Sequence, residues 1–491
     1  MSEQEPRYWK IGNIFFRNYP SLLGFIIMIS AAFAFALLFL IDLLAAHANP
    51  YMGILAYIVA PAFFFTGVGF LGFGWWLHRR NLARHVGDQS LQLTIDLSRP
   101  KDRRRLVVFV SCTILFLLIS AIGSHRTYKY TESNEFCGLV CHTVMEPEYT
   151  TYQLSPHARV ACVDCHIGSG TTWYVKSKIS GAYQVYSVLF DKYHRPIETP
   201  VANLRPARET CQECHWPEKF SGNLDRSYEH FLSDDDNTPY TVRMSLKVGG
   251  GNAEFGPVEG IHWHVANKVE YIATDPKRQE IPWIRVTRDD GTQSIFATED
   301  YMEAPPAGEI RMMDCIDCHN RPAHIFQSPN ELVEAAMVQG RISRTLPAIK
   351  DRAAVALTGS YETVEEAGAG IVEAMVKYYG DDPLVQPTAD ELFRLYRGHF
   401  FPAMDSSWEE YPDNIGHKDW PGCFRCHDDL HENGEGQVLR ASSCNTCHTI
   451  LAQGQGEELR QLAPAGLEFF HPDGEDVSGW LCSDCHTGAR Q

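Results

Sequence analysis

The chain has 491 residues, enough for several domains, and a formal net charge of −18 at pH 7. Its charge is unevenly distributed, because residues 1–130 carry 13 Lys and Arg against 6 Asp and Glu, whereas the remaining 361 residues carry 30 against 55. Such an acidic second part argues against nucleic acid as a binding partner. It fits either docking to a basic or neutral protein or a merely soluble acidic surface.

The first part of the chain predicts a membrane anchor. Three apolar runs are long enough to cross a bilayer, at residues 21–46, 52–77 and 106–123. A cleaved signal peptide is the alternative for the first run, but its apolar core is too long and two further runs follow. The loop at 78–105 holds eight Lys and Arg and the loop at 47–51 holds none, so the positive-inside rule places the N-terminus in the cytoplasm. Residues from 125 onward are then delivered to the outer face.

Some residues of these runs admit two interpretations. Glycines of the second run follow the spacing G-x-G-x-x-G, but no strand precedes them, so close helix packing is favoured over nucleotide binding. These glycines are Gly67, Gly69 and Gly72. Ionisable residues near the outer ends of the spans could shape a quinone pocket, although interfacial solvation is the simpler interpretation. They are Asp42, His47 and His125.

The second part repeats one short pattern, C-x-x-C-H, seven times. A c-type haem needs two cysteine thiols for its vinyl groups and an adjacent histidine to ligate the iron. Six repeats are strict, and the first has one extra residue between its cysteines. In chain order they are Cys137, Cys141 and His142; Cys162, Cys165 and His166; Cys211, Cys214 and His215; Cys315, Cys318 and His319; Cys423, Cys426 and His427; Cys444, Cys447 and His448; and Cys482, Cys485 and His486.

These repeats use all the cysteines except Cys112 and predict seven covalently bound haem c groups. A disulfide framework or zinc ribbons would also use C-x-x-C, but neither would place a histidine after every pair. Haem c is attached outside the bacterial cytoplasmic membrane, so the motif-bearing part is expected in the periplasm. The topology predicted from the charged loops agrees with this location.

We expect a mainly α-helical fold with much irregular structure, built from three transmembrane helices and a periplasmic multihaem domain with a small β-rich insertion. The insertion is indicated by the strand-like segments TVRMSLKV, VEYIAT and WIRVT, and later segments such as ELVEAAMVQG have helical periodicity. The predicted regions are a membrane anchor (1–125), a haem domain with motifs one to three (126–225), the β-rich insertion with motif four (226–328), a helical bridge (329–400) and a C-terminal trihaem unit (401–491).

A second axial ligand is expected for each electron-transfer haem, with histidine or methionine the usual residue. We favour His157, His194, His264, His324, His417, His431 and His471 as these distal ligands. In the segment IHWH, His262 competes with His264, since a β-strand would send both to the same face. His230 and His399 are expected to be surface or hydrogen-bonding residues. No motif replaces its final histidine with lysine, which disfavours an open catalytic haem.

Several segments together resemble the NapC/NirT family of membrane-anchored tetrahaem quinol dehydrogenases, which includes NrfH. They are FCGLVCHTVMEP, SPHARVACVDCH, DKYHRPIETP, ETCQECH and CIDCHNRPAH. The resemblance covers residues 106–225 and 312–326. It implies a membrane helix that carries a haem cluster and the transfer of electrons from quinol to periplasmic partners.

The same resemblance implies roles for individual residues. Met145 lies where family members place the methionine that ligates the first haem, although the spacing here is C-H-x-x-M rather than C-H-x-M. Lys176 and Lys178 are candidates for the family's lysine near the quinol, and Gln184 stands where an acidic residue is expected. His157, His194 and His324 resemble the distal ligands of the family.

Over its whole length the chain is similar to seven-haem inner-membrane cytochromes of metal-reducing bacteria. This similarity implies a quinol dehydrogenase that oxidises menaquinol and feeds periplasmic c-type cytochromes, with the quinone pool and membrane lipid as further partners. One alternative is a non-catalytic electron-transfer subunit fed by a partner dehydrogenase. A less favoured one is a terminal oxyanion reductase. An oligomer or a larger respiratory complex remains open.

Overall fold

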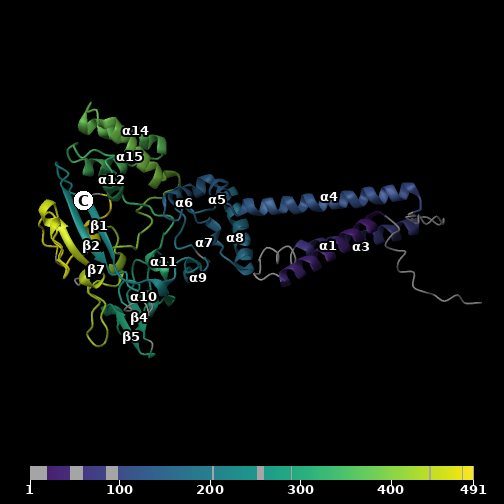
Figure 1. The fold of residues 1–491 in the computed structure, drawn as a ribbon, viewed down its shortest axis with the longest axis horizontal. Coiled ribbons are helices and arrows are strands. Elements are labelled where there is room, and N and C mark those ends of the chain that lie inside the picture. Colours follow the sequence, from purple (N-terminus) through teal and green to yellow (C-terminus); the bar gives the residue numbers. More distant parts are fainter. Residues whose placement is uncertain are drawn as a thin grey trace, which may run out of the picture. The chain divides into compact units, whose positions relative to one another are not determined.

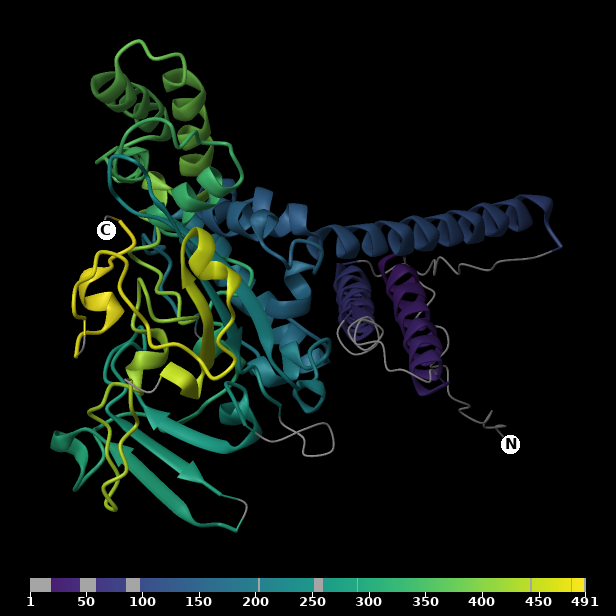
Figure 2. The same ribbon diagram turned by 60° about the vertical axis from the view of Figure 1, so that its left-hand side comes forward.

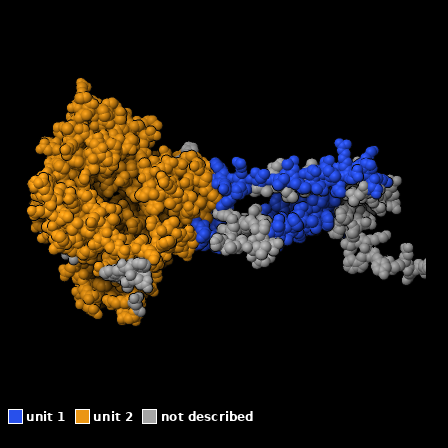
Figure 3. All heavy atoms as spheres, in the orientation of Figure 1, with its two compact units in different colours: residues 1–131, 168–181 blue, residues 132–167, 182–491 orange. Residues whose placement is uncertain are grey.

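A computed structural model describes residues 19–44, 59–84, 98–201, 204–250, 259–288, 290–441, 444–477 and 479–489. The chain divides into two compact units, which Figure 3 colours separately. Unit 1 comprises residues 1–131 and 168–181, and unit 2 comprises residues 132–167 and 182–491. The fold is helical with some strands, as predicted from the sequence.

Unit 1 is built from long apolar helices (Figure 1). Its helices are α1 (Tyr19–Leu44), α3 (Ala60–Arg84), α4 (Pro100–Thr131) and the first part of α8 (Thr171–Leu189). Two segments within the described residues, Tyr19–Leu37 and Ala60–Leu77, are long and apolar enough to cross a membrane. The sequence predicted three membrane spans. The third, at residues 106–123, lies within α4, which is a continuous helix of 32 residues. Its crossing of the membrane stays a prediction.

Small residues allow α1 and α3 to pack closely. A Cβ atom added at Gly67 would lie 2.7 Å from the carbonyl oxygen of Gly24, and one added at Gly24 would lie 2.6 Å from that of Gly67. Both distances are too short for any side chain, so the two backbones meet at this point. Nothing lies within 4 Å of a Cβ added at Gly69 or Gly72. The packing interpretation of this glycine pattern is therefore supported at Gly67.

Replacing Gly67 with alanine is expected to destabilise the α1–α3 pair by about 1–3 kcal/mol, because the backbones must separate to admit the new methyl group. Unfolding of the membrane unit by SDS in mixed micelles would measure this loss. Gly69→Ala is the matched control, since its added Cβ meets nothing and helix propensity favours alanine by about 1 kcal/mol. Equal effects of the two substitutions would contradict the packing.

Unit 2 contains mostly short helices joined by irregular segments. Its α-helices besides the end of α8 are α5 (Asn134–Leu139), α6 (His142–Leu154), α7 (Cys162–His166), α9 (Ala207–Cys211), α10 (Trp263–Ala266), α11 (Cys315–Cys318), α12 (Pro329–Val338), α13 (Ile349–Leu357), α14 (Val364–Tyr379), α15 (Val385–His399) and α16 (Cys482–Cys485). Its 3-10 helices are η2 (Pro217–Lys219), η3 (Glu299–Tyr301), η4 (Pro402–Met404), η5 (Gly422–Arg425), η6 (Cys444–Thr446) and η7 (Gly456–Arg460).

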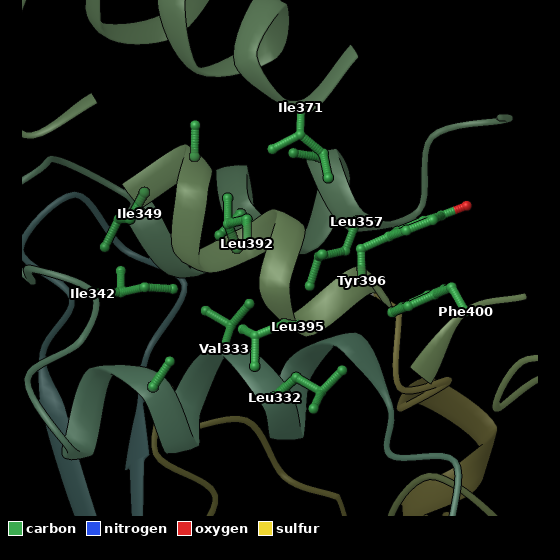
Figure 4. Close-up of a cluster of buried hydrophobic side chains, with 14 of the residues drawn as sticks. Leu332, Val333, Ile342, Ile349, Leu357, Ile371, Leu392, Leu395, Tyr396 and Phe400 are labelled. Carbon is green, nitrogen blue, oxygen red and sulfur yellow. The ribbon is translucent and has the colours of Figure 1, made fainter. Parts of the chain in front are cut away.

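The largest apolar core of unit 2 lies among helices α12 to α15 (Figure 4). Val333 of α12, Ile349 of α13, Ile371 of α14 and Leu392 of α15 are all fully buried in it. Each of these helices therefore turns one apolar stripe inward, as its periodicity predicted. These helices lie within residues 329–399 and carry none of the haem motifs, and the predicted region bounds stay a prediction.

Two antiparallel sheets complete unit 2. The first has the strand order β1 (Leu224–Phe231), β2 (Pro239–Leu246) and β7 (His448–Gly454), and these strands lie side by side in both ribbon views (Figures 1 and 2). The second has the order β5 (Gln293–Ala297), β4 (Trp283–Thr287), β3 (Lys268–Ile272) and β6 (Arg311–Met312). The three segments expected to be strands thus form β2, β3 and β4.

The β-rich region differs from the predicted insertion in one respect. Strand β7 comes from the segment expected to form a separate C-terminal unit, and it pairs with β2 from Thr241 opposite Gly454 to Leu246 opposite His448. The boundary predicted at residue 401 therefore separates strands that share a sheet. The two strands are about 200 residues apart in the chain, and each sequence pattern predicts only a strand, not its partner. Their pairing therefore could not be predicted from either segment.

Candidate haem-binding sites

Three of the haem motifs hold both cysteines on a single α-helical turn, in α7, α11 and α16. In a helical turn, residues three apart share a face, so both cysteines of C-x-x-C present their sulfur atoms to the same side. Three motifs have aspartate before the second cysteine, and this carboxylate accepts the backbone N–H of the residue before the first cysteine. Asp164 accepts from Ala161 (3.2 Å), Asp317 from Asp314 (2.8 Å) and Asp484 from Leu481 (3.0 Å). These bonds cap the first turn of α7, α11 and α16.

Six of the seven motif histidines face a second histidine from elsewhere in the chain. An iron held by two imidazoles on opposite sides, with metal–nitrogen bonds of about 2.0 Å, requires ring centres about 6 Å apart. The six observed separations all agree with that spacing. The pairs are His166 with His324 (6.2 Å), His215 with His157 (6.1 Å), His319 with His262 (6.4 Å), His427 with His264 (6.0 Å), His448 with His417 (6.2 Å) and His486 with His471 (6.0 Å).

The non-motif histidines of these pairs are oriented by hydrogen bonds from Nδ1. A histidine that ligates a metal through one ring nitrogen usually donates the other N–H to an oxygen, which fixes its tautomer. Five of the six do so, and Nδ1 of His417 is buried without a hydrogen-bond partner among the described residues. The five acceptors are Pro322 O for His157, Glu148 O for His324, Val248 O for His262, Ile261 O for His264 and Asp473 Oδ1 for His471.

Burial lowers the pKa of several of these imidazoles. It lowers the pKa of His324 to about 4, with help from the charge of Arg321. It also lowers the pKa of His427 to about 4, with a smaller contribution from His264. Neutral imidazole is the form that coordinates a metal ion, so the environment suits iron ligation. The ring spacing fits haem iron between each pair, and the hydrogen bonds of five of the non-motif histidines support the same interpretation.

The segment IHWH supplies one histidine to each of two pairs. His262 precedes α10 and faces His319, whereas His264 lies inside α10 and faces His427. The sequence suggested that the two histidines compete on one strand face. The local structure is helical instead, and in a helix residues two apart point about 200° away from each other. His262 is the ligand candidate that the preferred set lacked.

Neighbouring motifs touch one another inside unit 2. The side chain of Cys162 lies next to that of Cys137, and the side chain of Cys211 lies next to that of Cys315. Motif two therefore adjoins motif one, and motif three adjoins motif four. Because each thiol attaches one edge of a haem, the edges of consecutive haems are brought close.

A buried polar cluster fixes motif four to motif five. Asp317, between the cysteines of motif four, is only 3% exposed and accepts hydrogen bonds from Tyr271 (2.7 Å) and Arg311 (2.9 Å). Arg425, between the cysteines of motif five, donates to the backbone carbonyl of Asp317 at 2.7 Å and to that of Arg278 at 2.9 Å. These charge-assisted bonds hold the two motifs in one rigid arrangement.

Two of the favoured distal ligands lie elsewhere. His431 is 1% exposed, and both ring nitrogens are engaged, Nδ1 with Asp428 (2.8 Å) and Nε2 with the carbonyl of Ile281 (2.7 Å). It therefore has no nitrogen left for iron and serves a structural role. His194 is largely exposed, 3.6 Å from Glu198, and its ring contacts none of the motif histidines whose side chains are described. His431 is therefore not carried into the ligand set, whereas His194 stays a prediction because the side chain of His142 lies outside the described residues.

Comparison with known proteins identifies the family of the chain. The N-terminal region of the NapC/NirT cytochrome c family matches residues 99–199. The cytochrome c-type protein ImcH of Geobacter sulfurreducens is 38% identical over 493 aligned residues, which cover 96% of this chain and 96% of that protein. The chain belongs to this family of c-type cytochromes. Membership means covalently bound haem c, a membrane anchor and a role in electron transport.

Shorter similarities involve the first part of the chain. NrfH of Wolinella succinogenes is 29% identical over 113 residues, 22% of this chain and 62% of the relative. The cytochrome c nitrite reductase subunit NrfH of Nitratidesulfovibrio vulgaris is 32% identical over 88 residues, 18% of this chain and 54% of the relative. No solved structure matches the chain.

The residues that the family resemblance assigned to quinol oxidation lie in two units. Met145 is half-buried in the first turn of α6, in unit 2. The side chains of two motif residues, His142 and Cys444, lie outside the described residues. Lys176 and Lys178 belong to unit 1, where their ammonium groups lie 4.4 Å from the ring centre of Trp173 and 4.7 Å from that of Tyr174. Gln184 is exposed on the part of α8 in unit 2.

Proposed function

We propose that this chain is a membrane-bound seven-haem quinol dehydrogenase. It oxidises quinol, with menaquinol the favoured substrate, at the periplasmic face of the inner membrane and delivers the electrons to periplasmic c-type cytochromes. Each quinol converted to quinone yields two electrons and two protons. When bound, haem c supplies the one-electron chemistry that the amino acids lack.

The observation that carries this proposal is the set of six histidine pairs. Each pair offers imidazole nitrogens on both sides of one iron position, which would leave no coordination position for a small-molecule substrate at these six motifs. Six-coordinate sites of this kind suit electron transfer and disfavour a terminal oxyanion reductase. Contacts between consecutive motifs favour a continuous series of sites within unit 2.

In the proposed ligand set, the motif histidines are proximal ligands. The distal ligands are His324, His157, His262, His264, His417 and His471 for motifs two to seven in order. For motif one, the family resemblance supports Met145 as the distal ligand. It also supports Lys176, Lys178 and Gln184 as residues that bind quinol or accept its protons.

The proposed topology places the N-terminus in the cytoplasm and the haem-bearing part in the periplasm. Two observations support it independently: the eight Lys and Arg of residues 78–105, and the need to attach haem c outside the membrane. The quinone pool and membrane lipid then meet the anchor, and periplasmic cytochromes meet the acidic part. A larger respiratory complex is compatible with the same arrangement.

Anaerobic mixing of the purified holoprotein with a menaquinol analogue tests the proposed activity. We expect the reduced α-band to appear without any other protein, because the chain itself would hold the quinol site. Reduction that requires a partner dehydrogenase would contradict the proposal and favour a non-catalytic electron-transfer subunit.

Met145→Ala is expected to slow quinol-driven reduction by about tenfold or more, since it would remove a ligand at the haem nearest the quinol. Dithionite should still reduce the remaining haems of this variant fully. Met302→Ala, at an exposed methionine of unit 2, is the matched control and should retain the native rate. A Met145→Ala variant with that same rate would exclude Met145 from the quinol-accepting site.

A further inference from the structure

The second half of α8 exposes an unusual amount of apolar side chain. The residues concerned, which we name the apolar patch, belong to unit 2 and are Tyr183 (66% exposed), Val185 (54%), Tyr186 (41%), Leu189 (73%) and Phe190 (62%). Soluble surfaces carry such residues singly. A contiguous group of this kind indicates a surface that is covered in the working protein.

The apolar patch extends around most of the helix. Residues 182–186 are exposed without interruption, and at about 100° per residue they cover the whole circumference of the helix. In the next turn only Ser187 is buried. Gln184 is the one polar side chain among residues 182–186, so the exposed apolar surface is not confined to one face of the helix.

Charge distinguishes a lipid surface from a protein partner here. Residues 165–190 contain no Asp or Glu, although the 361 residues after residue 130 contain 55. Asp191, which follows this segment, pairs with Arg195 at 2.8 Å. The same segment holds Lys176 and Lys178, and Lys192 follows it with its Nζ donating to the Tyr186 hydroxyl at 2.9 Å. Tyrosine, tryptophan and lysine together are typical of the bilayer interface, where lysine reaches the anionic headgroups.

We propose that the apolar patch lies in the interfacial layer of a phospholipid bilayer, with the second half of α8 embedded beside the headgroups. Lys192 then meets headgroup phosphates, and the apolar patch itself carries no acidic side chain that would repel them. The patch thereby gives unit 2 its own attachment to the membrane. This inference does not depend on quinol oxidation, because membrane contact requires no substrate.

Nitroxide labels at Leu189→Cys and, separately, Val185→Cys test the depth of the patch. The full-length holoprotein would carry Cys112→Ser to remove the one cysteine outside the haem motifs, and would be placed in phospholipid nanodiscs. Accessibility to oxygen, which concentrates in lipid, is compared with accessibility to a water-soluble nickel chelate. Leu462→Cys, at a 55% exposed position of unit 2 far along the chain, is the matched control.

We expect the oxygen-to-nickel accessibility ratio at both patch positions to exceed that at residue 462 by about threefold or more. High nickel accessibility at the patch would overturn the proposal, since the patch would then face water. Low accessibility to both reagents would also overturn it, in favour of cover by a second copy of the chain or another protein. Both labelled positions are exposed, so neither substitution should prevent folding.

Discussion

Replacing His264 with alanine is expected to convert one low-spin haem to a high-spin, ligand-accessible haem. His264 faces His427 with ring centres 6.0 Å apart, and its Nδ1 is held by the carbonyl of Ile261, so its Nε2 is available for iron. About one seventh of the haem absorbance should acquire high-spin character, as read by absorption and electron paramagnetic resonance spectra. Electron delivery beyond motif five should slow by about tenfold or more.

Two further variants make this result specific. His264→Met should restore a six-coordinate haem and raise its reduction potential, because methionine ligation favours the reduced iron. His431→Asn should leave every low-spin signal in place, since both nitrogens of His431 bind protein oxygens. A new high-spin signal in the His431 variant, with none in the His264→Ala variant, would reverse the assignment.

His262→Ala is expected to produce a high-spin haem of its own, distinct from that of His264→Ala. The structural reason is that α10 sends the two histidines to different motifs, His262 to motif four and His264 to motif five. If the double variant had the same high-spin content as either single variant, both residues would serve one site, as a strand conformation would require.

Replacing Lys350 with alanine is expected to destabilise unit 2 by about 3–5 kcal/mol, because it leaves a buried carboxylate without its cation. Lys350 is 1% exposed, and its Nζ binds Glu334 at 2.8 Å and also the carbonyl of Phe231. Glu334 is itself 5% exposed and contacts His230 at 2.9 Å. The ion pair thus links helices α12 and α13 to strand β1.

Chemical denaturation of the holoprotein, followed by far-ultraviolet circular dichroism, measures this loss. Lys377→Ala, at an exposed lysine of α14, is the matched control and should change stability by less than about 0.5 kcal/mol. The double variant Lys350→Met and Glu334→Leu should recover most of the loss, since it removes both buried charges. A loss in the double variant as large as in the single one would show that packing, not charge, is responsible.

The same cluster sets a pH dependence. Burial alone would raise the pKa of Glu334, but the hydrogen bond with His230 and the charges of Lys418 and Lys350 outweigh it and lower the pKa from 4.5 to about 2. A carboxyl group whose pKa is lower in the folded state stabilises the fold above its unfolded pKa. This contribution is therefore present above pH 4.5 and is lost as the pH falls toward 2. Glu334→Gln should flatten stability across that window.

Much of the candidate site could be predicted from the sequence because haem attachment is a local, covalent signal. Two cysteines and a histidine within five or six residues specify one attachment site whatever the surrounding fold. All seven motifs could therefore be recognised in the sequence. Hydropathy identified α1 and α3 for a similar reason, since each span must satisfy its own backbone hydrogen bonds. Helices α12 to α15 followed from their 3.6-residue periodicity, and the segment of β2 followed from its alternation and flanking turns.

The distal ligands depended on tertiary structure instead. His324 and His166 are far apart in the chain, as are His264 and His427, and nothing local distinguishes them from His431, which proved to be bound to Asp428 and Ile281. The conformation of IHWH had to be known before His262 could be separated from His264.

The sequence by itself therefore determined that this protein is a membrane-anchored cytochrome c and where its C-x-x-C-H motifs lie. Only the tertiary structure decided which histidine faces each motif, that β7 completes the sheet of β2, and that α8 exposes its apolar side chains. The physical reason is that attachment needs neighbouring residues, whereas axial pairing, strand pairing and surface exposure are set by contacts between distant ones.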